Sequence, residues 1–208
     1  IRTGEEDELA AEENRAVSHP GETIREILAA YKSPKLPDMP PFTGGLVGYF
    51  SYDYIHYAEP TLDFSKLKND DFCDVDLMLF DRVIVFDHYR QKLILIAGVR
   101  TDSLEKSYRQ AEESLNEIVS LLQSGAKAVF RPLKLKEELA PAFSKEEYGA
   151  MVEKARHYIH EGDIFQVVLS NPMTAAAEGS LFDTYRVLRT LNPSPYMFYF
   201  TSDDVEIA

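Results

Sequence analysis

The stretch that decides the fold runs from Tyr158 to Ser170 and reads YIHEGDIFQVVLS. Its first residues complete a helical pattern, in which apolar side chains recur every three or four positions. The members of this apolar face are Tyr148, Met151, Ala155, Tyr158 and Ile159. Gly162 is expected to end the helix, because glycine adopts a left-handed backbone most readily. Ile164 to Leu169 then predicts a strand of β-branched and aromatic residues, with the polar amide of Gln166 inside it.

The start of this helix carries a capping box. Ser144 stands at the N-cap position and Glu147 follows three residues later, so their side chains can satisfy backbone N–H groups at the helix start. Upstream, residues 131–143 contain two prolines and alternating lysine and glutamate, which indicates a linker. We therefore expect an N-terminal unit over residues 18–130 and a second unit over residues 144–208.

The N-terminal unit is expected to mix helices and strands. One helix should run from Ser18 to Tyr31, and a longer one should begin at Asp102. Between them, two apolar β-rich runs at residues 76–87 and 92–97 flank a polar turn. These runs predict a hairpin, and their near-continuous hydrophobicity predicts that both faces are covered.

Three glycines interrupt the apolar segment FTGGLVGYFSYD at residues 42–53. A strand with several glycines is weak by propensity, so we interpret them as sites of close backbone approach or of a bulge. A phosphate-binding loop would lead directly into a helix, whereas YFSYD follows here, and this disfavours a nucleotide site.

The composition indicates a globular chain without a membrane span. Hydrophobic residues make up 45% of the 208 residues, and no run of about 18 apolar residues occurs. The net charge of −13 argues against nucleic-acid binding, which depends on Lys and Arg neutralising phosphates. Part of that charge lies in residues 1–17, which we interpret as an acidic flexible tail and not a signal peptide. The single cysteine, Cys73, fits a reducing cytoplasm.

Side chains with catalytic chemistry form no recognisable constellation in the sequence. His157 and His160 lie three residues apart on the predicted helix, where two metal ligands could sit. A third ligand is not in view, so two exposed histidines are the favoured interpretation. Aromatic residues cluster at residues 49–57 and 196–200, and we interpret both clusters as sheet core in preference to a ligand pocket.

Three segments resemble successive motifs of the chorismate-utilising enzymes, in the right order and spacing. They are FTGGLVGYFSYD at residues 42–53, GDIFQVVLS at residues 162–170 and RTLNPSPYMFY at residues 189–199. The resemblance runs from about Pro20 to Ala208 and is strongest to component I, the large subunit, of anthranilate synthase. It implies an α+β fold in which two antiparallel β-sheets pack as a sandwich with flanking helices.

The same resemblance implies a lyase reaction, in which chorismate and ammonia give anthranilate and pyruvate for tryptophan biosynthesis. Magnesium (Mg²⁺) is the implied cofactor, and a glutamine amidotransferase is the implied partner that delivers ammonia. Gln166 stands where relatives that add water to chorismate carry a lysine base, so it is expected to line the substrate site without acting as a base. The alternative is a strand amide that bonds to neighbouring backbone.

The turn at Pro195, Tyr196 and Met197 matches the part of the family that holds the feedback inhibitor tryptophan. A rigid proline with aromatic and thioether surface suits an indole ring, although the same residues could simply pack the turn. The turn sequence NPSPYM is closer to anthranilate synthase than to the related aminodeoxychorismate synthase, which is the alternative within the family.

The sequence also departs from the family pattern. The leucine-leucine-glutamate-serine motif of the tryptophan site is absent upstream of Pro20, and Asn171-Pro172 stands where an arginine pair is usual. The magnesium ligands, the histidine of pyruvate elimination and the residues that grip chorismate belong to a C-terminal half that these 208 residues lack. We therefore expect a fold that is incomplete at the C-terminus and a chain that is inactive alone. A non-catalytic tryptophan-binding module and a structural piece without ligand are the rival hypotheses.

Overall fold

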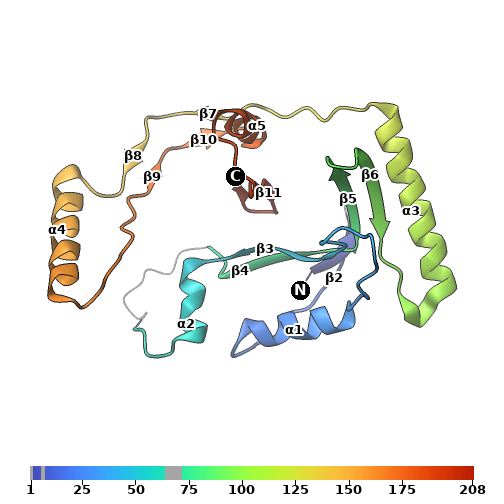
Figure 1. Ribbon diagram of the computed structural model, residues 1–208, viewed down its shortest axis with the longest axis horizontal. Coiled ribbons are helices and arrows are strands. Elements are labelled where there is room, and N and C mark those ends of the chain that lie inside the picture. Colours follow the sequence, from blue (N-terminus) through green and yellow to red (C-terminus); the bar gives the residue numbers. More distant parts are fainter. Residues whose placement is uncertain (1, 6–7, 64–71) are drawn as a thin grey trace. The chain divides into compact units, whose positions relative to one another are not determined.

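The computed structural model describes residues 2–5, 8–63 and 72–208 (Figure 1). The chain divides into two compact units, Ile1–Ala126 and Lys127–Ala208. Within the described residues the strands form six two-stranded sheets, and every strand pair is antiparallel. Helices and small antiparallel sheets place the chain in the predicted α+β class.

The first unit combines helices with three strand pairs. Its helices are α1 (Pro20–Ala30), α2 (Ile55–Ala58) and α3 (Leu104–Ser124), with 3-10 turns at Tyr52–Tyr54 and Thr101–Ser103. Its strands are β1 (Arg2–Glu5), β2 (Glu8–Glu12), β3 (Gly45–Phe50), β4 (Val75–Phe80), β5 (Arg82–Asp87) and β6 (Lys92–Ala97). β1 pairs with β2, β3 with β4, and β5 with β6. The helices α1 and α3 lie where the sequence predicts them.

The segment at residues 1–17, expected to be a flexible tail, contains the paired strands β1 and β2. The register joins Arg2 with Glu12 and Glu5 with Glu8. A strand pair satisfies backbone N–H and C=O groups whatever the side-chain charge. The acidic composition of the segment therefore carried no information about this pairing.

Gly48 confirms the interpretation of the glycine-containing strand. It lies opposite Leu77 of β4, and a Cβ atom built on Gly48 would overlap the carbonyl oxygen of Asp76. The same atom would lie 2.9 Å from the Cα of Leu77, closer than real Cβ contacts. Glycine is therefore required where these two backbones approach each other.

The apolar run at residues 76–87 forms two strands instead of one. The break falls at Asp81, which lies between β4 and β5. The carbonyl oxygen of Asp81 accepts a hydrogen bond from the Gly98 N–H at 2.7 Å, outside both ladders. This bond continues the β5–β6 register by one position, whereas β4 pairs with β3, so the apolar run is divided between two strand pairs.

The hairpin of β5 and β6 forms as predicted, but the expectation that both of its faces are covered is wrong. α3 contacts β6, where Ile96 is buried. On β5, however, Phe86 is 64% exposed and Ile84 is 41% exposed. Hydrophobicity shows that a face is suited to burial, and it does not supply the element that buries it.

The second unit contains two helices and three short strand pairs. Its helices are α4 (Lys145–Glu161) and α5 (Phe182–Leu191). Its strands are β7 (Lys134–Leu135), β8 (Ala140–Pro141), β9 (Met173–Thr174), β10 (Ala177–Glu178), β11 (Phe200–Thr201) and β12 (Glu206–Ile207). β7 pairs with β10, β8 with β9, and β11 with β12. The expected linker at residues 131–143 therefore contains two paired strands.

The ends of α4 confirm the local sequence signals. Ser144 accepts a hydrogen bond from the Glu147 N–H at 3.2 Å, and the Glu147 carboxylate accepts one from the Ser144 N–H at 2.8 Å. Gly162 adopts the left-handed conformation with φ of 83°. Both ends depend on residues within one helical turn, which explains why they could be predicted.

The strand predicted over Ile164 to Leu169 is wrong. These residues form no ladder with any strand that the structure describes, and they connect α4 to β9 (Figure 1). Phe165 is 93% exposed and Val168 is 83% exposed. β-branched and aromatic residues form a strand only where a neighbouring strand provides hydrogen bonds and side-chain contacts. In the aromatic cluster at residues 196–200, which we interpreted as sheet core, only Phe200 lies in a strand, β11.

Candidate functional site

The turn with the predicted inhibitor-binding residues connects α5 to β11 (Figure 1). Tyr196 is 89% exposed, and its backbone N–H lies 3.4 Å from the Ser194 hydroxyl that accepts from it. Pro195 is exposed and Met197 is half-buried. The three residues therefore offer an accessible aromatic and thioether surface.

A polar cluster ties the chain after this turn to the start of α5. The Glu206 carboxylate accepts a hydrogen bond from the Leu181 N–H at 2.6 Å and another from the Tyr199 hydroxyl at 2.9 Å. The Ser180 hydroxyl lies 3.3 Å from the Tyr199 hydroxyl and accepts from the Phe182 N–H at 3.1 Å. One carboxylate on β12 thus connects the first turn of α5 with the residue that precedes β11.

Aromatic rings pack around the same cluster. Tyr199 lies edge-on to Phe182, with 5.3 Å between ring centroids, and 5.8 Å from Tyr185. Phe182 also packs against Phe130 at 4.4 Å, and Phe200 is buried. Ring pairs at such separations are favourable. The start of α5 and β11 therefore share a small apolar core.

The hydrogen bonds of the cluster shift its pKa values. The Leu181 N–H stabilises the carboxylate and holds the pKa of Glu206 below its ordinary value of 4.5. The hydrogen bond with Ser180 lowers the pKa of Tyr199, but burial and the Glu206 carboxylate outweigh it and raise that pKa above 10.0. Near neutral pH, Glu206 is therefore charged and Tyr199 is a neutral donor.

Gln166 lies in the segment between α4 and β9, and its side chain is exposed. Two contacts hold the end of this segment. The Tyr148 hydroxyl donates to the Leu169 carbonyl at 3.2 Å. The Asn171 side chain accepts from the Phe143 N–H at 3.0 Å and donates to the Phe143 carbonyl at 3.1 Å. Within the described part of the chain, no hydrogen bond or ring contact joins Gln166 to the turn at residues 195–197.

The two histidines of α4 do not form a metal site. His157 and His160 are exposed, and His157 Nδ1 lies 4.0 Å from the Glu161 carboxylate. Across residues 2–5, 8–63 and 72–208, no group of three or more His, Cys, Asp or Glu side chains is placed to hold a metal ion. The described residues therefore do not fit a magnesium site.

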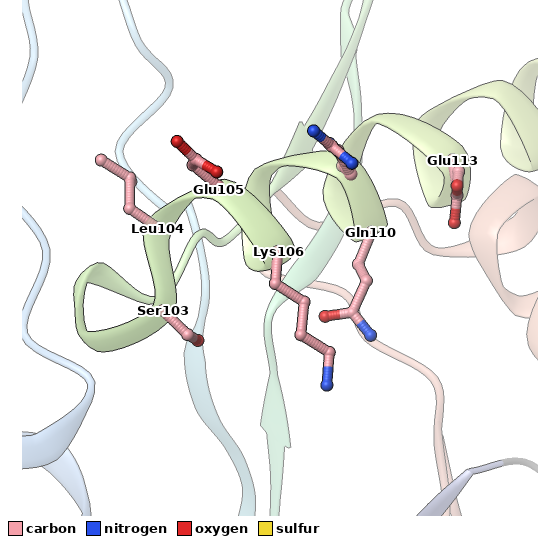
Figure 2. Close-up of a pocket in the computed structure, with 7 residues that line it drawn as sticks. Ser103, Leu104, Glu105, Lys106, Gln110 and Glu113 are labelled. Atoms are coloured by element: carbon pink, nitrogen blue, oxygen red, sulfur yellow. The ribbon is translucent and has the colours of Figure 1, made fainter.

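Two hollows in the first unit lie apart from the predicted site residues. The larger, of about 580 Å³, is lined by α3 and its cap alone, and Figure 2 shows side chains pointing to different sides of the helix. Its lining residues are Ser103, Leu104, Glu105, Lys106, Arg109, Gln110 and Glu113. The smaller, of about 260 Å³, lies between α1 and the β3–β4 pair and has mainly apolar walls. Neither hollow includes Gln166 or a residue of the turn at residues 195–197.

Sequence reasoning did not single out Ser180, Tyr199 or Glu206. Ser180 and Tyr199 are 19 positions apart, and Leu181 and Glu206 are 25 positions apart. No local motif marks contacts of this range. The available signals were a serine followed by Leu-Phe and a tyrosine in an aromatic run, and neither indicates the carboxylate that joins them.

Comparison with known proteins decides the family. The whole chain, residues 1–208, matches the chorismate binding enzymes. The chain belongs to the chorismate binding enzyme family. Anthranilate synthase component 1 of Acinetobacter calcoaceticus is 37% identical over 194 residues, which cover 88% of this chain and 37% of that protein. Anthranilate synthase alpha subunit 2 (chloroplastic) of Arabidopsis thaliana is 38% identical over 199 residues, which cover 88% of this chain and 32% of that protein.

A solved structure supports membership of the chorismate binding enzyme family. The crystal structure of anthranilate synthase component I from Streptococcus pneumoniae TIGR4 superposes with a TM-score of 0.69 at 31% identity. The match covers 87% of this chain and 41% of that one. The chain therefore spans well under half the length of these chorismate binding enzymes. In the described residues, no helix combines the length and apolar character needed to span a bilayer.

Proposed function

We propose that the chain is part of the large subunit of an anthranilate synthase, which converts chorismate and ammonia to anthranilate and pyruvate in tryptophan biosynthesis. The supporting observation is similarity along nearly the whole chain, including 36% identity over 191 residues to component 1 of Acetivibrio thermocellus. The chain spans 38% of that relative. The activity therefore belongs to a longer polypeptide, and these 208 residues alone are inactive in this proposal.

Gln166 and the turn at residues 195–197 have separate roles in the proposal. Gln166 lines the chorismate site, where its amide orients substrate by hydrogen bonding. An amide side chain does not act as a base near neutral pH, and ammonia is already a nucleophile, so no base is needed at this position. Pro195, Tyr196 and Met197 contact the indole ring of tryptophan, the feedback inhibitor, through their exposed apolar surface.

The same proposal includes a partner subunit, a cellular compartment and a metal ion. A glutamine amidotransferase subunit delivers ammonia, and the complex acts in the cytoplasm. The described residues do not fit a magnesium site, so we assign the ligands for Mg²⁺ to residues outside them. The roles proposed for Gln166 and for the turn at residues 195–197 do not depend on the ion. The small antiparallel sheets are components of a two-sheet sandwich with flanking helices.

Anthranilate fluorescence tests the catalytic part. The purified chain, incubated with chorismate, Mg²⁺ and an ammonium salt, should form no anthranilate. A chimera in which these residues replace the matching region of the A. calcoaceticus component 1 should form it, and Gln166→Ala in the chimera should reduce the rate at least tenfold. Gln110→Ala, which changes an exposed residue of α3, serves as the matched control.

Turnover by the chain alone would show that a complete site lies within it. A folded chimera without activity would contradict the assignment to anthranilate synthase.

Tryptophan fluorescence tests the inhibitor site. The chain contains no tryptophan, so indole emission reports added tryptophan alone. Titration should show saturable binding that Tyr196→Ala weakens. Binding that is unaffected by Tyr196→Ala, or no binding at all, would remove the inhibitor role from this turn.

A further inference from the structure

We propose that Glu206 is a positioning residue for the turn at residues 195–197, because its carboxylate holds Tyr199, two residues beyond the turn, against the first turn of α5. The inference rests on the proposed tryptophan site and adds the residue that keeps this site in place. It concerns residues within the second unit only.

Hydrogen bonds connect both ends of the turn to the same helix, α5. At the upstream end, the Asn192 N–H donates to the Leu188 carbonyl at 2.9 Å, so the turn leaves α5 in a fixed direction. At the downstream end, Tyr199 is held by the Glu206 carboxylate at 2.9 Å. Glu206 in turn accepts from the Leu181 N–H at 2.6 Å, at the other end of α5. The exposed residues between these anchors therefore span a distance that α5 sets.

A carboxylate is better suited to this position than a neutral group. It has two oxygens, one for the Leu181 N–H and one for the Tyr199 hydroxyl, and it donates to neither. Hydrogen bonds to a charged acceptor are roughly twice as strong as neutral ones. A negative charge at the start of α5 is also favoured by the helix dipole. Glutamine at this position would present one oxygen and lose the charge.

Hydrogen exchange measured by mass spectrometry on the 208-residue chain tests the positioning role. Glu206→Gln should speed exchange roughly tenfold at Leu181 and Phe182 and also within residues 195–199, because both hydrogen bonds of the Glu206 carboxylate, to Leu181 and to Tyr199, weaken together. Exchange in α4 should stay unchanged, which shows that the chain is still folded. Asp204→Asn, which removes one exposed carboxylate from the same hairpin, should leave residues 195–199 unchanged.

A double variant tests whether Glu206 acts through Tyr199. If it does, Tyr199→Phe and Tyr199→Phe/Glu206→Gln should speed exchange at residues 195–199 by equal factors. Alkaline titration measures the pKa of the Tyr199 phenol, if the signal of the matching Tyr199→Phe variant is subtracted from that of each protein. This pKa should be lower in Glu206→Gln than in the wild type, because the Glu206 carboxylate raises it. This titration shift would show that the Glu206 carboxylate contacts the Tyr199 hydroxyl in solution.

Tryptophan affinity connects the anchor to the proposed site. The Kd for tryptophan should rise about fivefold in Glu206→Gln and stay unchanged in Asp204→Asn. Unchanged exchange at residues 195–199 in Glu206→Gln, or an unchanged Kd despite faster exchange, would overturn the positioning role. If the turn exchanges faster in Glu206→Gln and tryptophan binds to neither protein, the anchor is supported and the inhibitor site fails.

Discussion

At the residue scale, position 48 is the most constrained glycine of the β3–β4 pair. A methyl group there would overlap the Asp76 carbonyl oxygen, and that atom belongs to backbone that cannot rotate away. We expect Gly48→Ala to destabilise the first unit by about 1–3 kcal/mol, the usual cost of overpacking. Urea denaturation followed by circular dichroism measures the change. Gly149→Ala is the control, because nothing lies within 4 Å of a Cβ atom at that position of α4.

The control should change stability in the opposite direction. Alanine is favoured over glycine inside a helix by about 1 kcal/mol, so Gly149→Ala should stabilise α4. Equal effects of the two variants would show that the close approach of β3 to β4 does not constrain position 48.

At the element scale, α4 depends on the reciprocal bonds of Ser144 and Glu147. The Ser144 N–H stabilises the Glu147 carboxylate and lowers its pKa below 4.5. A lowered folded-state pKa gives stability that is present above the unfolded value and is lost as pH falls through the folded value. Helicity of α4 should therefore decrease on acidification below about pH 4 in the wild type. In Glu147→Gln, hydrogen exchange of the α4 amides should lose this acid dependence.

Ser144→Ala separates the cap from the charge. Loss of the N-cap oxygen, which accepts from the Glu147 N–H, should cost about 1 kcal/mol at neutral pH. An acid dependence that persists in Glu147→Gln would assign the effect to another carboxylate.

The elements also show which structure could be predicted from sequence. The ends of α4 could be read from Ser144, Glu147 and Gly162, because each signal acts within one helical turn. The segment Ile164 to Leu169 could not, since a strand requires a partner that its own composition does not contain. The candidate site likewise contains residues that a local motif could predict and a residue that it could not. Pro195 to Met197 stood out as a motif, whereas Glu206 acquires its role from residues 7 and 25 positions away.

At the scale of the whole molecule, few side chains are fully buried. Among the residues whose side chains are described, the buried hydrophobic ones are Ile96 and Phe200. The slope of unfolding free energy against urea scales with the surface that unfolding exposes. We expect a slope of about 1 kcal/mol per M or less for the chain, with strong binding of a hydrophobic dye before urea is added. A slope near 3 kcal/mol per M without dye binding would show a well-buried core.

The segment between α4 and β9 has a consequence for handling the protein. Ile164 to Leu169, IFQVVL, is six residues long and contains no charge, proline or glycine, and Phe165 and Val168 within it face solvent. Such hexapeptides are the units from which amyloid-type fibrils assemble by stacking identical copies. Asp163 on one side and Pro172 on the other act as gatekeepers that restrict such stacking. These two residues protect only the ends of the segment, so we expect the chain to aggregate more readily as its concentration rises.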